Sequence, residues 1–404
     1  MSDTVTRLPN VCAKIRAGKT IRVGYFGGSV TNGYGATDQN ETSWRGLSLK
    51  WLNDTFGARY GCSFYEGKHA GLGGTGTNLN VYRADRALGL SGGEPVDLLF
   101  IEFAINDSYE ALSYDGSAYY LESIVRKVRT MAPACDTVVC LVTDIGKRDM
   151  SFANANAHAD VAAFYGIPVF PFGKYLWEYM EQAGGGRVPK SVDDPLWQSC
   201  FRDGCHPNDG GYRKYFEFLR DHFLTENLGE RQIAKAQSVT YALPSSLFSE
   251  KLTEAPFAGA APRLDAYDIV AGSAKNASLA YGFSGEDTLT ALHGGASLAV
   301  TFRSCSAGIY YEGNPDNGAL LYSVDGGDCK TLDLYAKQPV SNRHFMFYDH
   351  LPYGEHTVRL IFRATAGGAV FRLRAFVLDG DKEHFGAVLS DAPNKAPLPD
   401  ILPL

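Results

Sequence analysis

Four short segments, far apart in the chain, carry the residue types that acyl transfer requires. They are Phe26-Gly27-Gly28-Ser29-Val30-Thr31, Ala70-Gly71-Leu72-Gly73-Gly74, Ala104-Ile105-Asn106-Asp107 and Asp203-Gly204-Cys205-His206-Pro207-Asn208. In chain order they offer a hydroxyl nucleophile, a backbone N–H donor, an amide donor, and a carboxylate three residues before a histidine. Acyl transfer needs a nucleophile, a base with a group that orients it, and donors aimed at the developing oxyanion.

Ser29 follows the apolar run 21–26 and stands next to glycine, so a tight turn at the end of a strand is expected there. A glycine-rich turn before a helix can also bind a phosphate group. The segment 27–33 has neither the lysine of a P-loop nor the GxGxxG spacing of a dinucleotide site. The nucleophile is therefore the favoured hypothesis.

His206 lies three residues after Asp203, which is close enough for the carboxylate to fix the tautomer of the imidazole. A lone histidine is more often structural, and His69 and His158 are interpreted in that way. Asn106 ends a buried apolar run and could cap a strand, but its neighbour Asp107 suits that structural role better.

The order and spacing of the four segments resemble those of the SGNH hydrolases, the GDSL-type esterase superfamily, over roughly the first 225 residues. The resemblance implies Ser29 as the nucleophile, His206 as the base and Asp203 as the residue that orients it. It also implies an oxyanion hole formed by the Ser29 N–H, Gly74 and Asn106, with Gly73 as the rival of Gly74 after a shift of one residue. No cofactor is implied.

Three positions depart from the commonest pattern of that superfamily. Gly28 stands where an Asp is frequent, Ala104 where a Gly is usual, and His69 where an Asn is usual. None of these changes removes a chemical group that the mechanism requires. They argue against a typical lipase of the superfamily.

The composition limits the class of protein. With 404 residues, 45% of them hydrophobic and 21% charged, the chain is long enough for two globular domains. A net charge of −7 argues against nucleic acid or an anionic membrane as a partner. The N-terminal residues show no signal-peptide pattern, and no apolar run has the length of a membrane span. A cytoplasmic protein is expected.

Eight cysteines are scattered singly, several of them in apolar stretches, as expected for buried and reduced thiols. Cys200 and Cys205 could be imagined as metal ligands. Their spacing matches no zinc pattern, and no second pair lies nearby in sequence. No metal site is predicted.

The first half of the chain alternates strand and helix patterns. The predicted strands are 21–26, 63–66, 98–103, 137–142 and 167–170, and the predicted helices are 43–56, 77–90, 121–131 and 212–224. This alternation predicts a parallel sheet with helices on both faces, the three-layer α/β/α, flavodoxin-like arrangement of the SGNH hydrolases. We assign residues 1–230 to this catalytic domain.

From about residue 237 the pattern changes to short β-type runs separated by turn dipeptides. These runs are 296–302, 308–311, 319–324, 356–362 and 369–377. They predict an all-β sandwich over 237–404, similar to galactose-binding-like modules, with a proline-rich extended tail from 392. Tyr310, Tyr311 and Tyr348 could contact sugar rings, but for any one of them a place in the core is favoured.

The sandwich contains no tryptophan, since all four lie in the first half of the chain. A wall or lid next to the site is therefore preferred to an independent carbohydrate-binding module. The chain resembles two-domain carbohydrate esterases, which implies an acetylesterase acting on mannan- or xylan-derived oligosaccharides. A lipid or acyl-thioester hydrolase and a non-catalytic sugar-binding protein are the alternatives.

Overall fold

The computed structural model describes most of the chain. The described residues are 5–247 without 68, 91, 92 and 94, then 264–268, 283–285, 289–291, and 297–380 without 350, 366, 367 and 369. The chain divides into two compact units, Met1–Ala261 and Pro262–Leu404. The tail expected from residue 392 lies outside the described residues.

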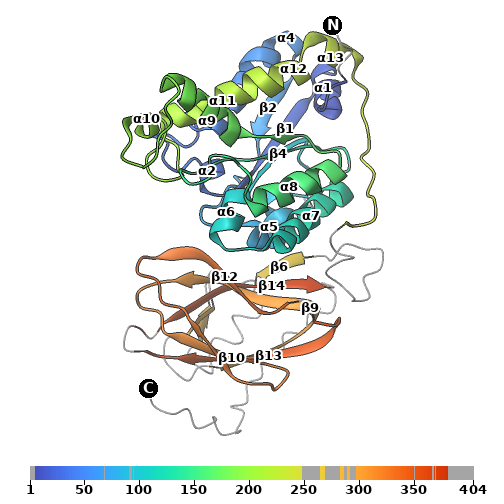
Figure 1. The fold of residues 1–404 in the computed structure, drawn as a ribbon. Coiled ribbons are helices and arrows are strands. Elements are labelled where there is room, and N and C mark those ends of the chain that lie inside the picture. The colour runs from blue at the N-terminus through green and yellow to red at the C-terminus, as the bar shows by residue number, and fades with distance from the viewer. Residues whose placement is uncertain are drawn as a thin grey trace. The chain divides into compact units, whose positions relative to one another are not determined.

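A five-stranded parallel sheet forms the centre of the first unit (Figure 1). Its strands are β1 (Thr20–Gly27), β2 (Ser63–Glu66), β3 (Leu98–Glu102), β4 (Asp136–Cys140) and β5 (Val169–Phe170), in the order β2-β1-β3-β4-β5. Every residue of β3 is buried, as expected for a central strand covered on both faces. The five predicted strands and the parallel sheet are confirmed.

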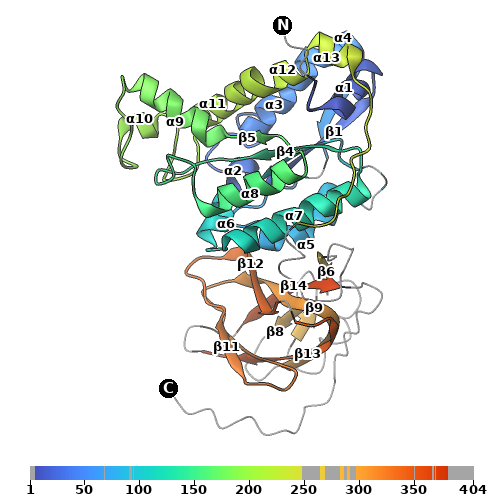
Figure 2. The ribbon, with the colours of Figure 1, turned by 45° about the vertical axis from the view of Figure 1, so that its right-hand side comes forward.

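Helices cover both faces of this sheet (Figure 2). One layer contains α5 (Thr77–Leu88), α6 (Ala104–Tyr109), α7 (Tyr114–Met131) and α8 (Ala153–Phe164). The other contains α1 (Pro9–Arg16), α3 (Trp44–Leu52), α9 (Phe172–Ala183), α11 (Asp209–Leu219), α12 (Thr225–Asn227) and α13 (Glu230–Lys235). The short elements α2 (Ser29–Asn32), α4 (Ala58–Tyr60), α10 (Pro195–Gln198), η1 (Asn53–Gly57) and η2 (Arg220–Leu224) complete the unit. In the described part of the chain, no helix is long and apolar enough to cross a membrane.

Of the helices in this unit that were not predicted, α8 and α9 are the longest. In α8, alanine alternates with asparagine, histidine or aspartate over 153–160, a period of two that imitates a strand. The helix forms because alanine is a strong helix former and because α8 packs against α7 and β4. Tertiary contacts therefore decide this element.

The segment 237–247, expected at the start of the second domain, lies against the first unit. The Val239 N–H donates to Asn10 Oδ1 at 2.8 Å, and the Tyr241 hydroxyl donates to Asp136 Oδ1 at 2.7 Å. Further along, the Leu247 N–H donates to Glu122 Oε1 at 2.6 Å. The first unit thus extends beyond the boundary at 230 that the sequence suggested.

The second unit is an antiparallel β-structure. Its strands are β6 (Leu264–Asp268), β7 (Phe283–Gly285), β8 (Leu289–Ala291), β9 (Ser297–Gly313), β10 (Ala319–Val324), β11 (Lys330–Asp333), β12 (Val340–Tyr348), β13 (Gly354–Arg363) and β14 (Phe371–Gly380). The long strand β9 pairs with β13 through its first half and with β12 and β14 through its second. It therefore connects two groups of strands.

Aromatic and aliphatic side chains fill the core of this second unit. Phe302 of β9 contacts Phe376 of β14 edge to face, with ring centroids 5.1 Å apart. Tyr311 and Tyr348 are also buried, and the Tyr348 hydroxyl lies 2.7 Å from the Ser304 hydroxyl. These two tyrosines are core residues, as the sequence favoured, while Tyr310 is half-buried.

Candidate active site

Ser29 and Asn106 lie at the same edge of the parallel sheet. Ser29 is the first residue of α2, directly after β1, and Asn106 belongs to α6, directly after β3. Because β1 and β3 are parallel neighbours, their carboxyl ends place the two residues side by side. This edge is where ligands bind in open α/β sheets.

The structure joins Ser29, His206 and Asp203 in a chain of hydrogen bonds. The Ser29 Oγ lies 2.8 Å from His206 Nε2. The other ring nitrogen, Nδ1, lies 2.8 Å from Asp203 Oδ2 and 3.1 Å from Oδ1. With its proton on Nδ1, the imidazole donates to the carboxylate and accepts from the serine hydroxyl. This is the arrangement in which a histidine can take the hydroxyl proton.

A short closed loop holds Asp203 and His206 in position. Phe201 and Pro207 form an antiparallel bridge, and the Arg202 N–H donates to the His206 carbonyl at 2.9 Å. The buried Trp197 supports the loop, since its indole N–H donates to the Asp203 carbonyl at 2.7 Å. The orientation of the pair thus depends on the backbone of one loop and on one tryptophan.

The environment keeps the Asp203 carboxyl ionised. Partial burial raises its pKa, but hydrogen bonds from the Cys205 and His206 backbone N–H groups and from the His206 ring outweigh that effect. The pKa therefore lies below its ordinary value. A carboxylate in this state can stabilise the imidazolium that forms when His206 accepts a proton.

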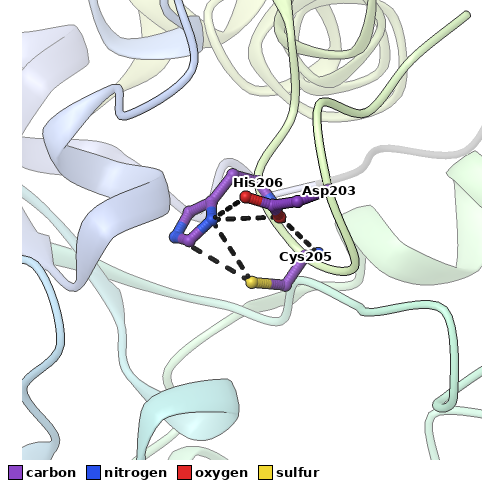
Figure 3. Close-up of side chains that lie close together, drawn as sticks. All are labelled: Asp203, Cys205 and His206. Atoms are coloured by element: carbon purple, nitrogen blue, oxygen red, sulfur yellow. Dashed lines mark hydrogen bonds and ion pairs between the residues drawn. The ribbon is translucent and has the colours of Figure 1, made fainter. Parts of the chain in front are cut away.

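Asp203, Cys205 and His206 also place three possible metal ligands within 4.8 Å of one another (Figure 3). Both nitrogens of His206 are already hydrogen-bonded, one to Asp203 and one to Ser29. Burial raises the pKa of the Cys205 thiol to about 12, and a metal binds the thiolate form. The donor set fits proton transfer better than it fits a metal ion.

Asn106 lies directly over Gly28. A Cβ atom on Gly28 would lie only 2.0 Å from Asn106 Oδ1, so in this chain a side chain at position 28 would displace the amide. Asn106 is 6% exposed. The amide therefore occupies a defined place next to the residue that precedes Ser29.

The glycine cluster 71–74 borders the same turn. The Leu72 N–H donates to the Gly27 carbonyl at 2.9 Å, which fixes the cluster to the end of β1. A Cβ on Gly73 would meet Ser29 Cβ at 3.4 Å, so Gly73 faces the serine side chain. Gly74 follows in the left-handed conformation, with φ of 68°. Within the cluster, Gly73, the alternative to Gly74 as a donor, therefore lies next to the side chain of Ser29.

The carboxyl group of Asp107 lies in a buried cluster of hydrogen bonds. The sequence assigned this residue only a general structural role. Its carboxylate accepts hydrogen bonds from the Thr77 N–H at 2.6 Å, the Thr77 hydroxyl at 2.8 Å and the Ser117 hydroxyl at 2.5 Å. His158 Nε2 lies 2.9 Å from the same carboxylate. Asp107, the residue after Asn106 in α6, therefore connects α6 with Thr77 of α5, Ser117 of α7 and His158 of α8.

Glu102 is a second buried carboxyl at the site, and sequence reasoning missed it. It is 1% exposed at the end of β3, where its Oε2 accepts a hydrogen bond from the Thr31 hydroxyl at 2.8 Å. Burial raises its pKa to about 8, although hydrogen bonds from Thr31 and from the backbone lower it in part. The signal was present in the sequence, since Glu102 is a charged residue inside an otherwise apolar run.

Comparison with known proteins finds a family profile that matches much of the first unit. Residues 25–214 match the profile of the GDSL-like lipase/acylhydrolase family. The matched segment contains Ser29, Asn106, Asp203 and His206. No curated protein sequence matches the chain.

Two solved structures are similar over nearly the whole chain. Both are crystal structures of a two-domain esterase (CEX) active on acetylated mannans, one of them co-crystallized with mannopentaose. The co-crystal structure has a TM-score of 0.72 at 19% identity and covers 94% of this chain and 95% of its own. The other has a TM-score of 0.71 at 19% identity and covers 94% and 96%. At this identity the similarity establishes a shared two-domain fold.

Proposed function

Since residues 25–214 match the GDSL-like lipase/acylhydrolase family, we propose that this protein is a serine esterase that removes acetyl groups from oligosaccharides. The observation that carries the proposal is the hydrogen-bonded series from Ser29 through His206 to Asp203. A serine hydroxyl next to a base, with the base held by a carboxylate, is the general arrangement for covalent acyl transfer.

In the proposed reaction Ser29 Oγ attacks the acetyl carbonyl carbon, while His206 Nε2 takes the hydroxyl proton. The carbonyl oxygen becomes an oxyanion, held by the Ser29 N–H, the Asn106 amide and an N–H of the glycine cluster at Gly73 or Gly74. Collapse breaks the ester bond, and His206 returns its proton to the departing sugar hydroxyl. Water, activated by His206, then releases acetate and restores Ser29.

The substrate class is the finer part of the proposal. The support is the fold shared with an esterase active on acetylated mannans, together with a second, antiparallel β-unit of the kind appended to carbohydrate esterases. Mannan- or xylan-derived oligosaccharides are the proposed substrates. A lipid or acyl-thioester hydrolase would use the same serine, histidine and aspartate and is the second candidate.

We also propose that the enzyme works in the cytoplasm. All eight cysteines lie in the described part of the chain and all are free, six of them buried. Reduced, buried thiols are typical of proteins from reducing compartments. Fractionation of source cells with marker enzymes tests this point.

A substrate panel tests the proposed function. Acetate release from acetylated manno- and xylooligosaccharides is compared with hydrolysis of p-nitrophenyl esters from acetate to octanoate. We expect acetyl esters to be cleaved faster than octanoyl esters and an acetylated oligosaccharide to be a substrate. A kcat/KM that rises steadily with acyl chain length would instead support the lipid or thioester hydrolase.

A further inference from the structure

We propose that Tyr109, together with Tyr34, forms a platform on which a pyranose ring of the substrate stacks next to Ser29 and His206. This inference rests on the proposed function and specifies it. It names the side chains that would favour a sugar over an acyl chain.

These two tyrosines are exposed where aromatic side chains are usually buried. Tyr109 is 57% exposed and Tyr34 is 42% exposed. By contrast Trp44, Trp177 and Trp197 are at most 4% exposed and belong to the core. An exposed aromatic ring next to reactive groups is a candidate for ligand contact.

Both tyrosines contact the loop that carries His206. The Tyr34 ring lies edge to face against the imidazole, with centroids 4.6 Å apart. The Tyr109 side chain lies next to the Cys205 thiol, and that sulfur lies 3.5 Å from His206 Nδ1. A group that rests on these rings would therefore lie close to the histidine that exchanges protons with the substrate.

The Tyr109 ring is already held in place without a ligand. Its hydroxyl donates to Asp144 Oδ2 at 2.8 Å, and Asp144 is itself 3% exposed. The Lys147 ammonium lies 4.9 Å from the ring centroid and 2.7 Å from the same carboxylate oxygen. Because the ring is fixed in advance, binding does not have to order it, and more of the contact energy contributes to affinity.

The surroundings of the two rings fit a sugar better than an acyl chain. A pyranose offers an apolar C–H face to an aromatic ring and hydroxyl groups around its rim. The Lys147 ammonium lies over one face of the Tyr109 ring, and the Arg202 Cζ lies over one face of the Tyr34 ring, 5.3 Å from the centroid. A sugar stacked on the opposite face of each ring would have these N–H donors at its border. A hydrocarbon chain could pack against the rings, but it has no hydrogen-bond acceptor to offer to the two cations.

The test separates sugar binding from ester chemistry. Unacetylated mannotetraose is used as a competitive inhibitor of p-nitrophenyl acetate hydrolysis, and acetylated mannotetraose as the substrate. Tyr109→Leu keeps bulk but removes the aromatic face, and Tyr109→Phe keeps the face but removes the hydroxyl. We expect Tyr109→Leu to raise the Ki of mannotetraose about tenfold and to lower kcat/KM for the acetylated sugar more than for the aryl acetate.

Tyr109→Phe should retain most of the affinity for mannotetraose. Tyr65→Ala is the matched control, since Tyr65 is 37% exposed on the edge strand β2, and it should behave as wild type. An unchanged Ki in Tyr109→Leu overturns the platform even when the wild type releases acetate. A Tyr109→Leu effect on the KM of p-nitrophenyl octanoate, with none on mannotetraose, also overturns it and assigns the rings to an acyl chain. Failure of the wild type to deacetylate any oligosaccharide refutes the proposed function instead.

Discussion

Asn106 gives the most specific prediction at the scale of single residues. Its amide lies over Gly28, next to Ser29, and is proposed to donate to the oxyanion. Asn106→Ala should lower kcat by roughly 10²–10³ with little change in KM, because the donor acts mainly when charge develops. Steady-state kinetics with p-nitrophenyl acetate measure this. A change confined to KM would make Asn106 a residue that binds the ground state.

Glu102 predicts a dependence of stability on pH. Its folded pKa of about 8 lies above the unfolded value of about 4.3, so between these values the folded protein holds one more proton than the unfolded chain. This contribution to stability is complete below pH 4.3 and is lost as pH rises towards 8, by up to about 1.4 kcal/mol per pH unit. Glu102→Gln should remove this loss.

Urea denaturation at pH 5 and pH 8 tests the contribution of Glu102. The difference in unfolding free energy between the two pH values should be smaller in Glu102→Gln than in the wild type. Glu181→Gln, at a side chain that is 47% exposed, serves as the control and should leave the difference unchanged. An equal pH dependence in Glu102→Gln and the wild type would show that Glu102 ionises normally.

At the scale of single residues, the sequence is enough to predict contacts between residues that lie a few positions apart in one motif. Asp203 and His206 are three residues apart, so a single loop brings them together. The partners of Glu102 and Asp107 come from other elements, and their burial depends on the packing of whole helices. Short-range patterns do not contain that information. Of the two glycines that the sequence offered as donors, Gly73 faces the side chain of Ser29, and the assignment of the N–H to Gly73 or Gly74 stays a prediction.

At the scale of elements, Asp107 holds four helices around the proposed oxyanion donors. The glycine cluster leads into α5 at Thr77, and Asn106 precedes Asp107 in α6. Asp107→Ala would leave the Thr77 N–H and the His158 ring buried without their acceptor. We expect a loss of about 3–5 kcal/mol in stability. We also expect a lower kcat, because the glycine cluster and Asn106 lose their common anchor.

Denaturation and kinetics on the same variants test the role of Asp107. Asp107→Asn keeps the size and one acceptor oxygen, so it should be less destabilised than Asp107→Ala. Asp115→Ala, in the first turn of the neighbouring α7, is a control that should stay close to wild type. Equal stability of Asp107→Ala and the wild type would refute the anchoring role.

The elements themselves were predictable where their residues carry a clear period or a long apolar run. The predicted strand 63–66 has the bounds of β2, and the run 98–103 differs from β3 by one residue. The run 296–302, from Ser297 onward, and the run 308–311 are parts of the single strand β9, which passes through Arg303, Ser304, Cys305 and Ser306. These residues interrupt the apolar pattern, but their backbone continues to pair with β13 and β14.

At the scale of the whole molecule, every residue of the proposed triad and oxyanion hole belongs to the first unit, Met1–Ala261. A protein truncated after Ala261 keeps the segment 237–247, which hydrogen-bonds to Asn10, Asp136 and Glu122. We expect it to fold, as judged by circular dichroism, and to hydrolyse p-nitrophenyl acetate. A folded but inactive truncated protein would place an essential group in the second unit.

The same truncated protein tests the sequence prediction that the second domain acts as a wall for larger substrates. If that prediction is right, activity on acetylated oligosaccharides falls much more than activity on p-nitrophenyl acetate. Equal retention of both activities would contradict it. Tight binding of mannotetraose by the isolated second unit, Pro262–Leu404, would support an independent sugar site instead.

The central claim is that Ser29 cleaves acetyl esters of oligosaccharides. The most direct test is acetate release from acetylated mannotetraose by the wild type and by Ser29→Ala at equal concentration, with circular dichroism to confirm equal folding. We predict steady release by the wild type and a rate at least ~10³-fold lower for Ser29→Ala, because the covalent route is lost. Release by Ser29→Ala within tenfold of the wild-type rate, or no release by the wild type, would contradict the claim.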